Sequence, residues 1–577
     1  MDNQMSTFFE NKTRVYITLV LVPFCLYFKS LFFEFSPMDD QWMVIKNADV
    51  LSDWKNINLF FTNPLVGLYY RPLFSVSLMF DFQIGKTTPF IYHFSNLTFH
   101  LISVILLYKL FLNLKVSAKT SFLLTLIFSV HPVLLHAVAW IPGRNDVLLT
   151  IFILSASIYL IKFFIEDKNL HLFLHFFFFF AAMLTKENAC VVPLFFAVLA
   201  YNFKSSKKQS IKLILIWIIT LACWFILRNM AVKSTLSIGP DVFESIKKFG
   251  MGLLIYIGKS IIPIQQSIFP TLKNSGIIAG FISLSILIVI FLKFGVKNKI
   301  LAISGLVIFF SMISIPVWYG ATGSSGEHYE HRIYLPLIGL LLFVSQINFN
   351  QTSHAFTYML YAIALVFALK TFFRMNVYKT EMSFIDAGLK EAPDYYLFYA
   401  IKADKLLEQQ NYAASIPYYN SAINMQPTRP QLYSARGYAY NEIGNKEGSI
   451  SDFTKAIEIT QNNADMYLNR CLAYKKFGEY ENAAKDLAWL KKNAPKTIPP
   501  GLEEELNKQV YDLLEQKINK RISADPKNAV LYVERAKILL YKDKPDEALA
   551  DLKHACELEP GNTAFKTYLD QLSSRVN

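Results

Sequence analysis

The 577-residue sequence is poor in cysteine and in charged residues. Its five cysteines lie in apolar or helical segments without the spacing of a CxxC or metal-ligand motif, so they are expected to be small core residues. Charged residues make up 18% of the sequence, whereas apolar residues make up 53% and the mean hydropathy is +0.31. A composition this apolar excludes an ordinary soluble enzyme.

The apolar residues are concentrated before about residue 373, in runs long enough to cross a bilayer as helices. These runs lie at 15–35, 92–113, 120–139, 146–165, 169–184, 188–203, 212–230, 276–294, 300–318, 333–348 and 355–373. One further stretch, 249–264, is short and contains Lys259 and Pro263, so it could cross the membrane, re-enter it or lie at its surface. Without that stretch, the sequence predicts about eleven spans.

The formal charge of +13 belongs entirely to the apolar half of the chain. Residues 1–373 contain 29 Lys and Arg against 16 Asp and Glu, whereas residues 374–577 contain 28 of each sign. Short loops on one side of the predicted spans carry most of the lysines, and the opposite loops carry only Arg144, Lys186 and Arg332. This bias predicts a cytoplasmic N-terminus and an external C-terminal half, although a twelfth span would reverse the latter. It fits membrane topology better than a nucleic-acid surface, and we expect no nucleic-acid partner.

A 34-residue period begins near residue 396. Its aromatic position recurs as Tyr399, Tyr433, Tyr467 and Tyr532, and its small-residue position as Ala403, Gly437, Cys471 and Ala536. This pattern resembles the tetratricopeptide repeat, a pair of helices that stacks on its neighbours. Residues 496–528 are a degenerate copy or an inserted helix at 502–521. Such arrays usually present a concave surface to a protein partner, although each tyrosine taken singly is more often simple inter-helix core.

These patterns predict an all-α chain with three parts: a polytopic membrane-embedded domain at 1–373, a connector at 374–395, and a repeat α-solenoid at 396–577.

Polar residues gather on the predicted outer side of the membrane domain. Asp39 and Asp40 directly follow the first span, where a carboxylate can accept a proton from a hydroxyl. Arg144, Lys186 and Arg332 can supply cations to an anionic group, for which arginine has the bidentate geometry. Taken singly, the acids can be a solvated loop and the cations can be helix-end side chains that reach for water.

Taken together, the polar segments resemble a known series. The series runs Asp39-Asp40 with Asn47, Tyr70-Arg71-Pro72-Leu73, His93 with Asn96 and His100, His131-Pro132-Val133, Gly143-Arg144 with Asp146, Lys186-Glu187, and Glu330-His331-Arg332-Ile333-Tyr334-Leu335-Pro336. It is similar to that of the transmembrane and tetratricopeptide-repeat containing proteins, which are polytopic glycosyltransferases of the C superfamily (GT-C) related to protein O-mannosyltransferases. The resemblance covers nearly the whole chain.

The resemblance implies an inverting transfer of a sugar, with mannose expected, from a polyprenyl-phosphate donor to Ser or Thr of acceptor proteins. Asp39, and after it Asp40, would be the catalytic base. The implied donor and phosphate contacts are Arg71, Arg144, Lys186, Glu187, Glu330, His331 and Arg332, and the further donor or acceptor contacts are His93, Asn96 and His131. The repeats would bind the acceptor protein. The reaction would take place at the periplasmic or luminal face, and the Phe-, Ile-, Lys- and Asn-rich composition favours a bacterial inner membrane over that of the endoplasmic reticulum.

Two histidine features depart from this family. His136 stands where a glutamate is common, and His328 and His331 flank Glu330. The pair of histidines, with Glu327 and Glu330, also admits a metal site, but the ligands lie too close in sequence and we expect no required cofactor.

Two other functions remain open. A transferase that modifies a lipid or glycan would not need a peptide-binding array. A non-catalytic scaffold or export factor would keep the repeats for partners, but a transporter places its ionisable residues near the middle of the membrane rather than at one surface.

Overall fold

A computed structural model of the chain describes residues 8–9, 11–64, 69–232, 242–270, 276–322, 328–349 and 354–576. These residues are nearly all helical and form no strand, and Val296 and Ile347 are joined by an isolated antiparallel bridge. The chain divides into two compact units, Met1–Pro393 and Asp394–Asn577. The predicted all-α fold, with a membrane bundle followed by a helical repeat array, is confirmed.

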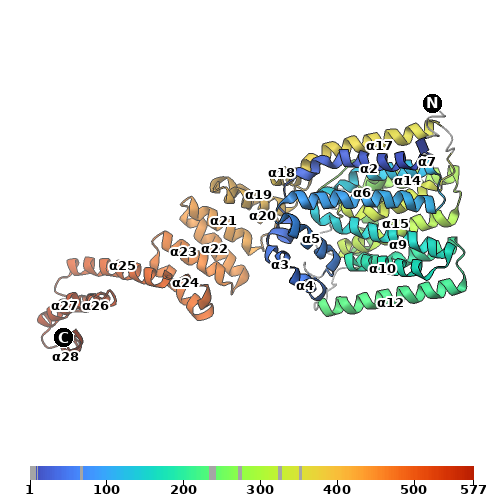
Figure 1. Cartoon of the computed structure of the whole chain (residues 1–577). Helices are drawn as coiled ribbons and strands as arrows, with labels where there is room; N and C mark the ends of the chain where they lie inside the picture. Colours follow the sequence, from blue (N-terminus) through green and yellow to red (C-terminus); the bar gives the residue numbers. More distant parts are fainter. Residues whose placement is uncertain are drawn as a thin grey trace. The chain divides into compact units, whose positions relative to one another are not determined.

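The first unit is a bundle of long apolar helices that run side by side (Figure 1). Within the described residues, seven helices are long and apolar enough to cross a membrane, and a bent pair makes a possible eighth. The seven are α2 (Lys12–Tyr27) with the turn η1 (Phe28–Phe32), α6 (Pro89–Asn113), α9 (Arg144–Glu166), α12 (Lys207–Ala231), α14 (Ile277–Phe294), α15 (Lys299–Thr322) and α17 (His354–Arg374).

The other predicted spans lie on shorter or broken helices. The run at 120–139 is α7 (Ala118–Ser129) and α8 (Leu135–Ala139), which bend by 47° around His131 and Pro132 because proline has no N–H to continue the helix. The runs at 169–184, 188–203 and 333–348 correspond to α10 (Asn169–Thr185), α11 (Val192–Asn202) and α16 (Tyr334–Ser345).

The ambiguous stretch 249–264 belongs mostly to one continuous helix, α13 (Val242–Ile261). It packs closely against α14, because a Cβ atom on Gly258 would lie 2.7 Å from the backbone nitrogen of Gly280. Lys259 is only 3% exposed. This stretch is therefore interior structure and not a loose surface segment.

Short helices fill a region to which the sequence patterns gave no structure. They are α3 (Ala48–Ser52), α4 (Ile57–Thr62) and α5 (Pro72–Gly85), and they lie at one end of the bundle (Figure 1). Their apolar residues share a core with Phe35 and Tyr92. Pro72 opens α5 at a position where its missing N–H has no cost.

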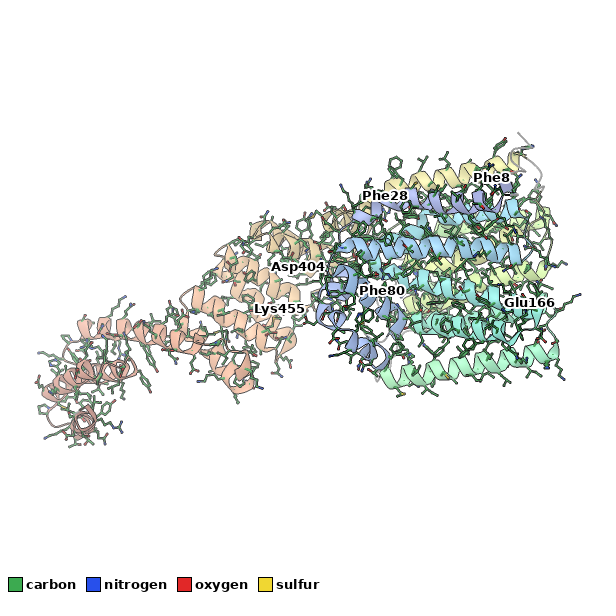
Figure 2. The ribbon with its side chains drawn as sticks, viewed as in Figure 1. Phe8, Phe28, Phe80, Glu166, Asp404 and Lys455 are labelled. Atoms are coloured by element: carbon green, nitrogen blue, oxygen red, sulfur yellow. The ribbon has the colours of Figure 1, made fainter. Side chains whose placement is uncertain are left out.

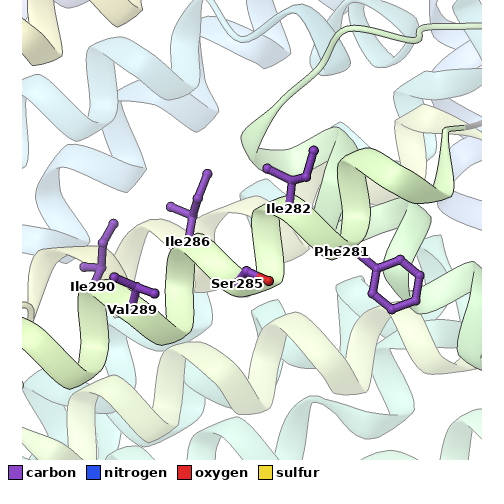
Figure 3. Close-up of a pocket in the computed structure, with 6 residues that line it drawn as sticks. All are labelled: Phe281, Ile282, Ser285, Ile286, Val289 and Ile290. Carbon is purple, nitrogen blue, oxygen red and sulfur yellow. The ribbon is translucent and has the colours of Figure 1, made fainter.

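Large apolar side chains cover the outside of the bundle. Phe28 is 46% exposed and Phe80 is 56% exposed (Figure 2). The outer face of α14 forms a shallow apolar groove of about 430 Å³, lined by Phe281, Ile282, Ser285, Ile286, Val289 and Ile290 (Figure 3). In water such a surface would aggregate, whereas lipid tails can cover it.

The second unit consists of helix pairs. They are α19 (Tyr396–Glu408) with α20 (Tyr412–Met425), α21 (Pro430–Glu442) with α22 (Lys446–Thr460), α23 (Ala464–Lys476) with α24 (Tyr480–Asn493), and α26 (Ala529–Tyr541) with α27 (Pro545–Leu558), followed by α28 (Thr563–Val576). Ala403, Cys471 and Ala536 are 0% exposed, as the repeat pattern predicts. At Gly437 a Cβ atom would lie 3.2 Å from the ring of Phe453, so small residues allow the paired helices to approach.

An arginine–aspartate pair recurs in three of these helix pairs. Arg436, Arg470 and Arg535 each bind, through two nitrogens, an aspartate sixteen residues further on, at 2.6–2.9 Å. Each also donates to a polar side chain sixteen residues earlier. Each of these three arginines therefore joins three helices. We call the three arginines, together with the side chains that they bind, the arginine ladder.

The irregular copy at 496–528 contains one long helix, α25 (Leu502–Ala524). It extends three residues beyond the predicted helix at 502–521. Leu502 and Leu506 pack with Cys471, whereas Ile518 and Ile522 pack with Tyr532. One helix thus contributes to two separate hydrophobic cores.

Candidate functional site

The acidic pair occupies a segment that connects η1 to the short helices. Asp40 is 1% exposed, and its Oδ2 accepts a hydrogen bond from the Ser36 backbone N–H at 2.8 Å, whereas its Oδ1 has no partner. Burial raises the pKa of Asp40 from 3.8 to about 7, against the opposing effect of the Ser36 hydrogen bond. Asp39 is exposed. The pair is therefore divided, with one carboxyl inside and one at the surface.

A turn of π-helix, Gln41–Ile45, directly follows the pair. Such turns are rare and often occur at functional sites. Gln41 also donates to Glu381 of α18 (Glu381–Glu391), and the backbone N–H of Glu34 donates to the Lys379 carbonyl at 3.2 Å. One distant segment, at Lys379 and Glu381, thus holds both ends of the loop that carries Asp39 and Asp40.

Arg71 is held by Glu187. Its Nε lies 3.0 Å from Glu187 Oε2, and the other carboxylate oxygen accepts from the Tyr70 backbone N–H at 3.1 Å. Both side chains remain about one-fifth exposed. Glu187 therefore orients the arginine and leaves part of its guanidinium open to a ligand.

Lys186 is buried beside Asp146. Its Nζ lies 2.6 Å from Asp146 Oδ2, and His331 Nε2 lies 3.8 Å from the same oxygen. Burial lowers the pKa of Lys186 to about 8, Asp146 opposes this shift, and Arg71 and Arg332 lower it further. Three segments of the chain thus place Arg71, Lys186 and Arg332 in one another's electric field.

Glu330 pairs with a residue that sequence reasoning did not assign to the site. Lys259 Nζ lies 2.7 Å from Glu330 Oε1, and both side chains are 3% exposed. The Ser267 backbone N–H donates to the same oxygen at 3.1 Å. The sequence did contain a signal for this pairing. Lys259 lies inside an apolar run, and an ionisable residue at such depth requires a partner.

Arg144 is enclosed by protein. It is 0% exposed, its Nε donates to Asn96 Oδ1 at 2.6 Å, and its Nη2 lies 2.5 Å from Asp81 Oδ2. The Tyr92 carbonyl accepts from the same Nη2 at 2.8 Å. Arg144 and Asn96, predicted as ligand contacts, thus join α5, α6 and α9, and sequence reasoning did not include Asp81.

His93 and His131 also lie inside the bundle, each 1% exposed. His131 contacts the Ser260 carbonyl through Nε2 at 3.2 Å, and its Nδ1 accepts from the Val133 backbone N–H at 3.3 Å. It therefore fixes the bend between α7 and α8. The ring of His93 packs 6.1 Å from that of Phe33, in the segment before the acidic pair.

No group of three or more His, Cys, Asp or Glu side chains that could hold a metal ion occurs among the described residues. His328 and His331 are described, but Glu327 lies outside the described residues. A reaction that requires no metal remains a prediction.

Comparison with known proteins supports the resemblance. The tetratricopeptide repeat model matches residues 430–463 and 529–562. A protein O-mannosyl-transferase of Caenorhabditis elegans is 24% identical over 354 residues, which are 56% of this chain and 49% of the relative. Human protein O-mannosyl-transferase TMTC3 is 33% identical over 153 residues, which are 24% of this chain and 16% of the relative. The predicted resemblance to this family is confirmed, and the chain spans about half the length, or less, of these relatives.

Solved structures are similar to part of this chain. The crystal structure of YrrB, described as a TPR protein with an unusual peptide-binding site, is 16% identical and covers 32% of this chain and 96% of that chain, with a TM-score of 0.21.

Proposed function

We propose that this chain is an integral membrane glycosyltransferase that transfers mannose from a polyprenyl-phosphate donor to Ser or Thr hydroxyls of acceptor proteins. The observation that supports this most is the grouping of Arg71, Lys186 and Arg332, which come from three distant segments and influence one another electrostatically. Three cations in a largely buried setting suit a phosphate that gains charge as it leaves. The names of the relatives supply the sugar and the acceptor class.

Asp39 is the proposed base because it is exposed, so an acceptor hydroxyl can reach it. Its carboxylate takes the hydroxyl proton as the oxygen attacks the anomeric carbon from the face opposite the phosphate. The bond from that carbon to the phosphate oxygen breaks with inversion, and the phosphate leaves as an anion beside the three cations. Asp40 holds the loop through Ser36 and positions its neighbour.

Two carboxylates hold the cations of the proposed phosphate site in position. Glu187 orients Arg71, and Asp146 holds Lys186. Each pairing partly offsets the burial of its cation, so the site is assembled before the donor arrives.

The repeats are proposed to hold the acceptor protein. One groove in the described part of this unit has a volume of about 720 Å³ and is lined by α26 and α28. Lys537, Tyr541 and Tyr568 supply its polar groups and aromatic rings, which can bind an extended peptide. We place this unit on the periplasmic or luminal side and the N-terminus in the cytoplasm, with a bacterial inner membrane favoured.

The test is transfer of labelled mannose from a polyprenyl-phosphate donor to proteins by membranes that contain the chain. Asp39→Asn should lower the rate by about 10²- to 10⁴-fold, as expected on loss of a general base. Asp49→Asn, an exposed change in the same region, is the matched control and should keep the wild-type rate. Full activity in Asp39→Asn would contradict the role of this residue.

The labelled product separates the other candidate functions. Label in lipid or free glycan, with none in protein, would favour a different acceptor. If wild type transfers no sugar from any polyprenyl-phosphate donor, while deletion of the repeats still causes a phenotype, the chain is a scaffold or export factor.

A further inference from the structure

Four aromatic rings form a cluster beside the grouped cations. They belong to His136 of α8, Trp140, and Tyr329 and His331 at the start of η7 (Glu330–Ile333). The ring centroid of His331 lies 5.1 Å from His136, 5.3 Å from Trp140 and 5.4 Å from Tyr329. Trp140 and Tyr329 stack at 6.2 Å. We call these four residues the ring cluster.

Three nitrogens of the ring cluster lack hydrogen-bond partners. They are His136 Nδ1, His331 Nδ1 and Trp140 Nε1, and all three are buried. The residues themselves are 2%, 6% and 6% exposed, respectively. An unpaired buried polar atom is costly, and most such atoms in native proteins are satisfied. Three within one group of touching rings indicate a ligand that pairs with them together.

The chemistry of the ring cluster restricts the ligand. Burial and the neighbouring cations keep the pKa of His331 well below 6.5, so its imidazole is neutral and offers one donor and one acceptor. The indole N–H adds a second donor. Neutral donors and acceptors beside aromatic faces suit a pyranose, whose hydroxyls form hydrogen bonds while its C–H faces lie on the rings.

The position of the ring cluster relates this ligand to the proposed phosphate site. His331 Nε2 lies 3.8 Å from the Asp146 oxygen that holds Lys186, and Arg332 is the next residue in the chain. A sugar at the ring cluster would therefore have its phosphate beside the cations.

We propose that His136, Trp140 and His331 bind the hydroxyls of the sugar carried by the donor, and thus determine which sugar is accepted. This inference rests on the proposed function, because it assigns the sugar-binding part of the same site.

The test measures the binding of two probes to the purified full chain in nanodiscs by calorimetry. One probe is a short-chain polyprenyl phosphate, and the other is the same carrier with mannose attached. Trp140→Phe removes the indole N–H and keeps an aromatic ring. It should weaken binding of the mannosylated carrier about 5- to 10-fold, the loss of one hydrogen bond, and leave binding of the bare carrier unchanged.

Trp224→Phe is the matched control. It also removes a buried indole N–H that has no partner, but it lies in α12, outside the ring cluster. This variant should bind both probes as wild type does.

The outcomes separate the inference from the function on which it rests. Equal weakening of both probes by Trp140→Phe, or weakening of neither, would overturn the sugar site while leaving the transferase proposal intact. If wild type binds neither probe, the proposed function fails and this inference fails with it. His136→Phe should reproduce the selective loss, and unchanged affinity in that folded variant would also count against the sugar site.

Discussion

The membrane unit and the repeat unit both contain ion pairs between a basic and an acidic side chain, but the two units differ in how deeply and how regularly these pairs are placed. In the membrane unit, Arg144–Asp81, Lys186–Asp146 and Lys259–Glu330 are nearly inaccessible to water, and each has its own geometry and its own set of partners. In the repeat unit one arginine–aspartate geometry recurs three times, and its arginines remain 17–26% exposed.

This difference distinguishes ion pairs that assemble one particular site from ion pairs that support a repeated fold. A fully buried ion pair is expensive to desolvate and is tolerated where it holds a particular arrangement, whereas a pair whose arginine still reaches water costs less in each copy and can recur. Irregular buried pairs therefore mark the part of this chain where chemistry is expected, and the regular pairs mark its architecture.

The largest expected effect is on the most enclosed pair. Arg144→Met leaves the Asp81 carboxylate buried without its cation, which should cost about 3–5 kcal/mol. The yield of monodisperse protein in detergent and its melting temperature would measure this loss. Adding Asp81→Asn removes the stranded charge and should restore part of the yield. A single variant as stable as wild type would contradict the cost expected for breaking this enclosed pair.

An intermediate effect is expected at Asp40 and depends on pH. Its pKa of about 7 in the folded chain exceeds the ordinary 3.8, so the folded chain holds a proton that the unfolded chain releases between these values. The stability contributed by this carboxyl is present in full below about pH 4 and is lost as the pH rises through 7, with an upper limit of about 4 kcal/mol.

Asp40→Asn keeps an oxygen for the Ser36 N–H and cannot ionise. Its melting temperature should therefore exceed that of wild type by more at pH 8 than at pH 5. The exposed Asp49→Asn should shift the melting temperature equally at both pH values. A pH-independent difference for Asp40→Asn would mean that the carboxyl titrates normally.

The smallest expected effect is on the ladder. Arg470→Met should destabilise the repeats by about 1–3 kcal/mol, because it removes two charge-assisted hydrogen bonds to Asp486. Hydrogen exchange should rise in α23 and α24 and stay unchanged in the membrane helices. Lys455→Met removes a pair between exposed side chains and should change neither. A rise of exchange throughout the membrane helices would show that the two units are not independent in stability.

The sequence predicted the elements whose patterns are local. The apolar runs gave the long helices, and the recurrence of Ala403, Cys471 and Ala536 gave the repeats, because a buried small residue is required at each helix crossing. Helices α3 to α5 were missed, since they are short and gain their stability from contact with residues such as Tyr92, far along the chain.

The role of the selected site residues remains a prediction, whereas their positions and ion-pair partners can be compared with the structure. Lys186, Arg71 and Arg332 were selected as cations on outer loops, and the structure brings them together. The partners Asp81 and Lys259 were not selected. Each lies 63 or more residues from the residue that it binds, and the spacing of residues within a short segment cannot predict so distant a contact.

The long helix α25 has a mechanical consequence. Its 23 residues span about 34 Å, and its two halves are embedded in two different cores. A tilt imposed on one core is therefore delivered to the other as the rotation of a stiff rod, with no intervening loop to absorb it. These two cores can in this way pass a displacement to each other, and a pair of glycines at Leu513 and Leu514 would turn the rod into a hinge.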